Sequence, residues 1–90
     1  MGIERSFIIA NELGLHARAA TRLVQTTNRF EAEVDVEKDG TRVNGKSIMG
    51  VLMLVAAKGT RITVFADGPD AEAAMDAIGV LIENKFDEER

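Results

Sequence analysis

The sequence predicts an α+β domain of two layers, in which helices cover one face of an antiparallel β-sheet. Two segments, residues 32–38 and 61–66, alternate apolar and polar residues as half-buried strands do. Segments with the helical spacing of apolar residues separate the strands, which predicts the order β-α-β-β-α-β-α. A chain of 90 residues can enclose one hydrophobic core, so we expect a single domain over residues 1–90.

The first strand is expected over residues 5–10, where Phe7 and Ile9 share one face. A helix then runs from residue 17 to about residue 28, and His16 is expected to cap it. Apolar positions at i, i+3, i+4 and i+7 form its buried stripe, which consists of Ala20, Leu23, Val24 and Thr27.

The next two strands form a hairpin. Both valines of residues 32–38 are expected to face the core. The pair Asp39-Gly40 is a hairpin turn signal, so residues 41–44 form the short returning strand.

A second helix begins after Ser47, which is expected to cap it. We expect this helix to reach about Ala57, because Lys58 and Gly59 supply a basic residue and a glycine stop. The strand that follows places three apolar residues on one side, namely Ile62, Val64 and Ala66.

The last helix is expected to open at Pro69. Its buried stripe consists of Ala71, Ala74, Met75, Ile78 and Ile82. Residues 87–90 are expected to fray.

Composition excludes several classes of function. The 15 acidic residues outnumber the 11 basic ones and the chain has no Tyr or Trp, whereas nucleic-acid surfaces need positive charge and stacking platforms. One histidine and no cysteine leave no ligand set for a transition metal, so we expect no metal and no cofactor. No segment has the roughly 18 apolar residues of a membrane span. We expect a cytoplasmic protein with protein partners.

His16 lies in the run Gly14-Leu15-His16-Ala17-Arg18, where a loop gives way to the first helix. The first N–H groups of a helix lack internal partners and favour an anion, together with the helix dipole. The same field disfavours an imidazolium, so His16 is expected to stay neutral and nucleophilic. The backbone N–H of Ala17 and the planar guanidinium of Arg18 complete a predicted phosphoryl site.

A second motif competes for the middle of the chain. Residues 40–47 match the P-loop pattern G-x-x-x-x-G-K-S, and residues 62–67 resemble a strand that ends in a metal-binding Asp. A P-loop joins a buried parallel strand directly to its helix, whereas Gly40 follows a half-exposed strand. We therefore interpret Ser47 as a helix cap and not as part of a nucleotide site.

The helix after Ser47 is apolar over most of its circumference. One stripe is Val51, Leu54 and Val55, and the second apolar set is Ile48, Met49, Leu52 and Met53. Methionines suit surfaces that accept several shapes. We expect this second set, with Ala20, to dock partner proteins.

The sequence resembles HPr, the family of histidine-containing phosphocarriers of the bacterial phosphotransferase system, over essentially the whole chain. Residues 14–18 are similar to the active-site signature of that family, and residues 46–52 resemble its serine signature. The resemblance implies an open-faced β-sandwich, with a four-stranded antiparallel sheet and three helices on one side. It also implies that His16 takes a phosphoryl group on Nδ1 from enzyme I and passes it to enzyme IIA domains, assisted by Arg18.

The resemblance further implies that Ser47, which follows Lys46, is phosphorylated in bacteria that possess HPr kinase/phosphorylase. The protein would then be a monomeric, stoichiometric carrier and not an enzyme. Ala19 departs from the proline of many members, and we expect a less rigid helix start there. The alternative is a regulatory binding module, in nitrogen control or catabolite repression, but the presence of His16 favours a carrier.

Overall fold

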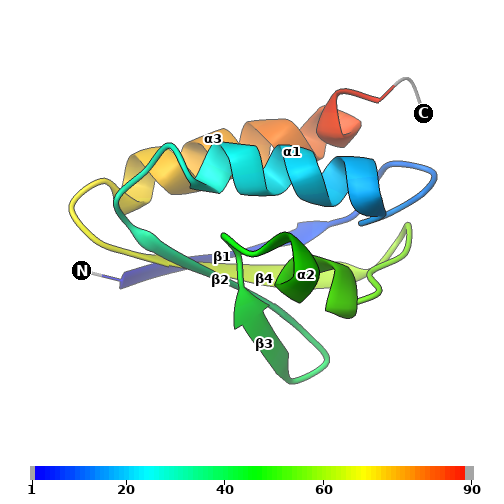
Figure 1. Ribbon diagram of the computed structural model, residues 1–90, viewed down its shortest axis with the longest axis horizontal. Helices are drawn as coiled ribbons and strands as arrows, with labels where there is room; N and C mark the ends of the chain where they lie inside the picture. Colours follow the sequence, from blue (N-terminus) through cyan, green and yellow to red (C-terminus); the bar gives the residue numbers. More distant parts are fainter. Residues whose placement is uncertain (1, 89–90) are drawn as a thin grey trace.

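The computed structural model describes residues 2–88 and confirms the predicted α+β architecture (Figure 1). The sheet consists of β1 (Gly2–Ile8), β2 (Glu33–Lys38), β3 (Thr41–Asn44) and β4 (Arg61–Asp67). The strands lie in the spatial order β1-β4-β2-β3, and every neighbouring pair is antiparallel.

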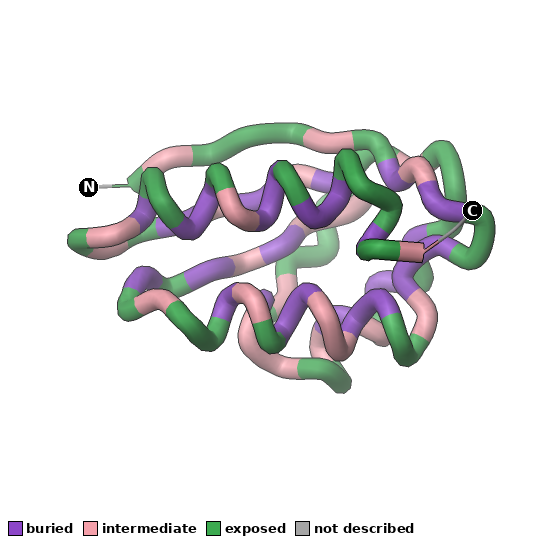
Figure 2. The backbone as a smooth tube through the Cα atoms, turned by 90° about the horizontal axis from the view of Figure 1, so that it is seen from above, coloured by how far each residue is buried: buried purple, intermediate pink, exposed green. Residues whose placement is uncertain are grey.

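Three helices cover one face of this sheet, in the predicted order along the chain. They are α1 (Ala17–Thr27), α2 (Ile48–Met53) and α3 (Ala71–Glu83), followed by the 3-10 turn η1 (Lys85–Asp87). Figure 1 shows α1 and α3 side by side over the sheet, whereas the shorter α2 lies near β3. Buried segments recur along the two long helices in Figure 2, as expected for amphipathic helices packed on a sheet.

The predicted core stripes and the predicted hairpin are confirmed. In the two long helices and in the strands of residues 32–38 and 61–66, every predicted core residue is buried, namely Ala20, Leu23, Val24, Thr27, Val34, Val36, Ile62, Val64, Ala66, Ala71, Ala74, Met75, Ile78 and Ile82. Asp39 and Gly40 have φ values of 50° and 83°, so both central residues of the turn are left-handed, as tight hairpin turns require.

The boundaries of β1 differ from the prediction. The strand starts at Gly2 because its pairing with β4 extends to the pair Gly2↔Asp67, and it ends at Ile8. Ile9 is fully buried but lies beyond the strand, and its backbone bonds to the Gly59 N–H and the Thr60 carbonyl. Phe7 remains half-buried on this edge strand.

The helix α2 is shorter than predicted, because the chain leaves the helix to reach the loop before α1. Val55 adopts φ 51° and is exposed, so it does not belong to the core stripe with Val51 and Leu54. The carbonyl of Ala56, beyond the end of the helix, accepts a 2.8 Å hydrogen bond from the Leu15 N–H. Nζ of Lys38 donates to the carbonyls of Leu54 and Val55 at 3.2 and 3.1 Å. It thereby provides hydrogen-bond donors for carbonyls at the helix end, which lack partners within the helix.

The helix α3 begins at Ala71, two residues after Pro69. Asp70 precedes its first turn but makes no side-chain cap. Its carboxylate instead accepts the N–H groups of Glu31 and Ala32 at 2.9 and 2.8 Å, so Asp70 ties the start of β2 to the start of α3.

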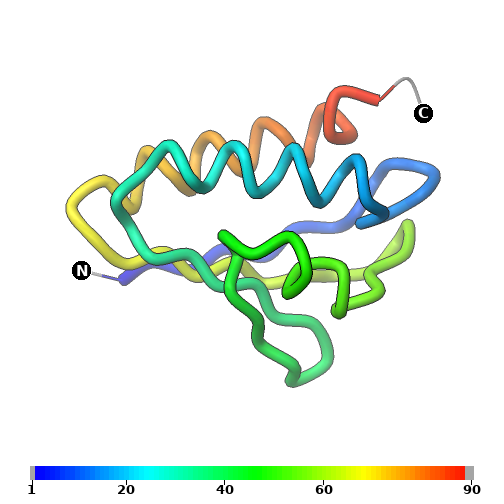
Figure 3. The backbone as a smooth tube through the Cα atoms, viewed as in Figure 1, coloured from blue at the N-terminus to red at the C-terminus, as the bar shows by residue number. Residues whose placement is uncertain are grey.

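The expectation that residues 87–90 fray is wrong for the part of the tail that the structure describes, and positions 89 and 90 lie outside it. Lys85, Phe86 and Asp87 all adopt left-handed φ values between 56° and 62°. This turn buries Phe86 completely, and Nη1 of Arg22 donates to the Phe86 carbonyl at 2.5 Å. Figure 3 shows the result, with the C-terminal segment and the loop before α1 at the same end of the molecule.

Candidate functional site

His16 is the N-cap of α1, as predicted, and its backbone is extended with φ −85° and ψ −177°. Its Nδ1 atom accepts the N–H of Arg18 at 3.4 Å. The imidazole side chain is 27% exposed, so part of it reaches solvent at the start of the helix. The ring is therefore placed where the N-terminal N–H groups favour an anion.

Gly14 fixes the loop that carries His16. Its φ is +67°, and a Cβ at this position would lie 2.4 Å from the Ala56 carbonyl oxygen. The next residue, Leu15, is buried and donates its N–H to the same oxygen. Only glycine combines the left-handed backbone with this close approach, which explains its place two residues before His16.

The second ring nitrogen of His16 contacts the C-terminal segment. Nε2 lies 2.5 Å from Oε2 of Glu88, whose side chain is only 10% exposed. Nδ2 of Asn11 donates to the other oxygen of Glu88 at 2.9 Å and to the Gly14 carbonyl at 2.8 Å. Asn11 is fully buried, and its Oδ1 has no partner within residues 2–88.

These contacts determine the charge of Glu88. Burial works to raise the pKa of its carboxyl, but the hydrogen bonds from Asn11 and His16 and the charges of His16 and Arg22 outweigh burial. The pKa of Glu88 is therefore held below its ordinary value, and the group is a carboxylate at neutral pH.

The hydrogen bonds also define the tautomer of His16. A backbone N–H can only donate, so Nδ1 must be the unprotonated acceptor toward Arg18. An ionised carboxylate can only accept, so Nε2 must carry the hydrogen that faces Glu88. Both neighbours thus favour a neutral ring whose unprotonated nitrogen is Nδ1.

The other predicted members of the site lie around this nitrogen. The side chain of Arg18 is exposed and extends from the first turn of α1, and Ala17 is exposed as the first residue of that helix. The Ala17 N–H has no hydrogen-bond partner in the described part of the chain, as is usual for a helix start. Arg18 and Ala17 can therefore both donate to an anion near Nδ1.

Ser47 is the N-cap of α2, as predicted, and its Oγ accepts the Gly50 N–H at 3.1 Å. Nζ of Lys46 donates to the Phe30 carbonyl at 2.7 Å, so Lys46 anchors the loop before β2. Gly40 lies in the turn between β2 and β3, with a strand between it and Ser47. The structure thus confirms that residues 40–47 do not form a P-loop.

The expected second apolar face of α2 is present, but one predicted docking residue is misplaced. Ile48, Met49 and Met53 are exposed, the last two to 69% and 73%, and Leu52 is half-buried. Ala20 is fully buried on the core-facing side of α1 and therefore cannot contact a partner. Leu13 and Val55 are exposed apolar residues that the sequence analysis did not assign to this surface.

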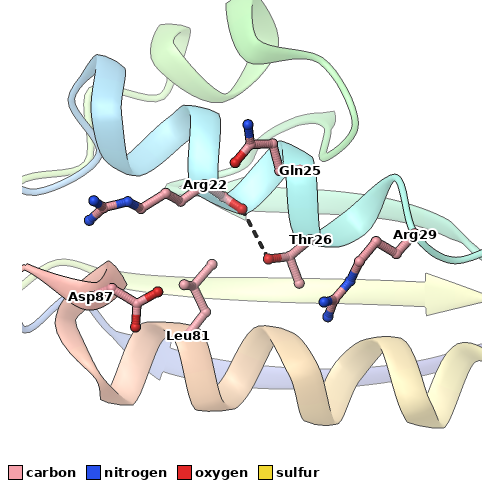
Figure 4. Close-up of a pocket in the computed structure, with 6 residues that line it drawn as sticks. All are labelled: Arg22, Gln25, Thr26, Arg29, Leu81 and Asp87. Atoms are coloured by element: carbon pink, nitrogen blue, oxygen red, sulfur yellow. Dashed lines mark hydrogen bonds between the residues drawn. The ribbon is translucent and has the colours of Figure 1, made fainter.

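A separate depression lies between α1 and α3 (Figure 4). Its lining consists of Arg22, Gln25, Thr26, Arg29, Leu81 and Asp87. In this wall Oγ1 of Thr26 donates to the Arg22 carbonyl at 3.0 Å. None of the predicted site residues lines it.

The described residues contain no group of three or more His, Cys, Asp or Glu side chains arranged to hold a metal ion. Within residues 2–88, no helix has the length and apolar character needed to cross a membrane.

Known proteins resemble this chain over nearly its whole length. The family model described as "PTS HPr component phosphorylation site" matches residues 3–84. A phosphocarrier protein HPr of Xylella fastidiosa is 47% identical, with 97% of this chain and 98% of the relative covered. A phosphocarrier protein NPr of Shewanella violacea is 44% identical, with 96% and 94% covered. The crystal structure of an HPr from Thermoanaerobacter tengcongensis superposes with a TM-score of 0.94 at 44% identity, over 98% and 99% of the two chains.

Proposed function

The chain belongs to the HPr family of phosphocarrier proteins, and from this premise we propose that His16 is its phosphoryl acceptor. The proposed donor is phosphorylated enzyme I, and the proposed acceptors are enzyme IIA domains of sugar transporters. The observation that carries the proposal is the half-exposed imidazole whose Nδ1 lies at the start of α1 beside Arg18. Such a carrier is modified and restored in each cycle and is not an enzyme.

The proposed transfer needs no proton movement at His16. The lone pair on Nδ1 forms the new N–P bond, while the bond between phosphorus and the donor's histidine breaks and its electron pair returns to the donor ring. Nε2 keeps its hydrogen throughout, because Glu88 accepts it before and after the step. The positive charge that develops on the His16 ring lies against this carboxylate.

Arg18 and the Ala17 N–H are the proposed ligands of the phosphoryl oxygens. A planar guanidinium can donate two hydrogen bonds to a phosphate, and a helix start adds backbone donors. Both residues are exposed, so the proposed site has few ligands and remains open. An open site suits a relay, because an intermediate bound too tightly would not be passed on.

The second apolar face of α2 is the proposed docking surface for these partners. It consists of Ile48, Met49, Leu52 and Met53. The helices α1 and α2 pack against each other, so this surface and the start of α1 belong to neighbouring elements. Exposed methionines adapt to partners of different shape, which a carrier with several partners requires.

Ser47 is the proposed regulatory site. A phosphate on its Oγ would add up to about two negative charges directly before Ile48 and Met49. Repulsion and desolvation would then weaken docking without a change of fold. HPr kinase/phosphorylase is the proposed modifying partner, and Lys46 positions the loop through its bond to the Phe30 carbonyl.

A second candidate function is regulatory, in nitrogen control and not in sugar uptake, and the similarity to an NPr favours it. The experiment that separates the two gives the protein labelled phosphate through enzyme I and then offers two acceptors. Passage of the label to a sugar-specific enzyme IIA supports the carrier role, whereas passage only to a nitrogen-regulatory domain supports the alternative. In either role we propose a cytoplasmic monomer.

A further inference from the structure

We propose that Glu88 and Asn11 form a positioning pair that holds the His16 ring with Nε2 protonated and Nδ1 unprotonated. The C-terminal segment, which the sequence analysis expected to fray, is then a working part of the site. This inference rests on the proposed function for the statement that Nδ1 reacts, but the positioning itself can be measured without any phosphoryl transfer.

The geometry of the pair supports this role. One carboxylate oxygen of Glu88 faces Nε2 of His16 at 2.5 Å, and the other accepts from Asn11 at 2.9 Å. Each oxygen thus has a different partner, and the two hydrogen bonds together restrict rotation of the carboxylate. A ring nitrogen held by a fixed carboxylate cannot exchange roles with the opposite nitrogen, as in other orienting carboxylate–histidine pairs.

Burial makes the arrangement rigid. Asn11 is fully buried and its Nδ2 also donates to the Gly14 carbonyl at 2.8 Å, so the same amide braces the loop that carries His16. The Glu88 side chain is 10% exposed. A water molecule therefore competes poorly for the hydrogen on Nε2, and the bond is stronger than one at the surface.

The backbone of the C-terminal segment delivers Glu88 to this place. Phe86 is fully buried as an anchor, and Arg22 donates to its carbonyl. The titratable groups that face the Glu88 carboxylate are His16 and Arg22. The left-handed turn of η1 directly precedes Glu88, at the cost of an uncommon backbone for three side-chain-bearing residues.

The reaction gives the carboxylate a second effect. As the N–P bond forms on Nδ1, the ring changes from neutral to cationic while Nε2 keeps its hydrogen. Glu88 stabilises this charge more than the neutral ground state, so it favours the transition state for transfer. Glu88 acts through His16 and does not touch the phosphoryl group.

The test compares E88A and E88Q with E83Q, a matched control at an exposed carboxylate on the end of α3. Proton NMR of the unphosphorylated protein at about pH 8, where a typical imidazole is neutral, follows the hydrogen on Nε2 of His16. We expect a downfield signal protected from water in the unaltered protein and in E83Q. The signal should exchange rapidly in E88A and should persist, less downfield, in E88Q, because the amide oxygen still accepts. An unchanged signal in E88A would overturn the proposal.

The second arm measures the initial rate of phosphoryl transfer from phosphorylated enzyme I. We expect kcat to fall about 10-fold in E88A and less in E88Q, with an unchanged KM, because Glu88 lies outside the docking surface. A full rate in E88A would contradict the proposal. If the unaltered protein takes up no phosphate, the proposed function fails, while the NMR arm still decides the positioning role. If E88A loses its C-terminal turn, seen as a large fall in Tm, E88Q decides both arms.

Discussion

Glu88 lies 72 residues after His16 in the chain, yet its Oε2 is 2.5 Å from Nε2 of that histidine. The contact joins the end of the polypeptide to the loop before α1, and Asn11 links both to the Gly14 carbonyl. The site is thus built from two segments that are distant in the sequence.

Gly14→Ala should destabilise the fold by about 3 kcal/mol or more, since a left-handed φ costs about 1–2 kcal/mol and the added Cβ meets the Ala56 oxygen. Gly40→Ala is the matched control, because Gly40 has φ +83° but nothing within 4 Å of an added Cβ. It should lose only the conformational part, about 1 kcal/mol. Urea unfolding of both variants checks this, and equal losses would show that the close approach at Gly14 has no energetic effect.

Ser47→Asp should slow transfer from enzyme I without lowering Tm, because it places a negative charge beside the apolar face of α2. Ser47→Ala removes the hydrogen bond to the Gly50 N–H and adds no charge. We expect it to cost about 1 kcal/mol of stability and to leave transfer unchanged. The measurements are transfer kinetics and thermal unfolding. Slow transfer in both variants would show that the added negative charge is not the cause.

Replacing Met49 and Met53 with Ser should raise the KM of enzyme I for this protein by roughly 10-fold. Exposed apolar anchors are lost from the proposed docking surface. Val80→Ser is the control, since Val80 is also exposed but lies on α3. Tm should stay constant in all these variants. An unchanged KM in the methionine variants, or an equal rise in Val80→Ser, would show that partners dock on another surface.

Asp70 should make stability depend on pH in the acid range. The hydrogen bond from the Glu31 N–H is the main cause that lowers the pKa of Asp70, and it outweighs desolvation. Because the folded pKa lies below the ordinary value of 3.8, the stabilisation is complete above that value and is lost as the pH falls through the folded pKa. Asp70→Asn should flatten this part of the stability curve, measured by denaturant unfolding across the acid range. An unchanged curve would contradict the assignment.

Local patterns were sufficient to predict most of the fold. The hairpin at Asp39 and Gly40, the stripes of α1 and α3 and the cap at Ser47 each depend on residues close in sequence. The end of α2 could not be predicted in this way, because it depends on the bond between Leu15 and Ala56, which are far apart in the chain.

The same difference between local patterns and distant contacts decided which residues of the site could be predicted. His16, Ala17 and Arg18 form a contiguous signature, and the structure brings them together at the start of α1. Asn11 and Glu88 were missed, because their contact spans 77 residues and a terminal glutamate carries no local signal. Ala20 shows the opposite error, since it was expected to dock partner proteins whereas its position on the core stripe buries it.

The most direct test of the central claim is to incubate the protein with enzyme I and labelled phosphoenolpyruvate and to locate the phosphate. The account predicts an acid-labile, base-stable phosphate on Nδ1 of His16, absent from His16→Ala, while that variant keeps its fold by circular dichroism and Tm. Label that persists in His16→Ala, or no label in the unaltered protein, would contradict it.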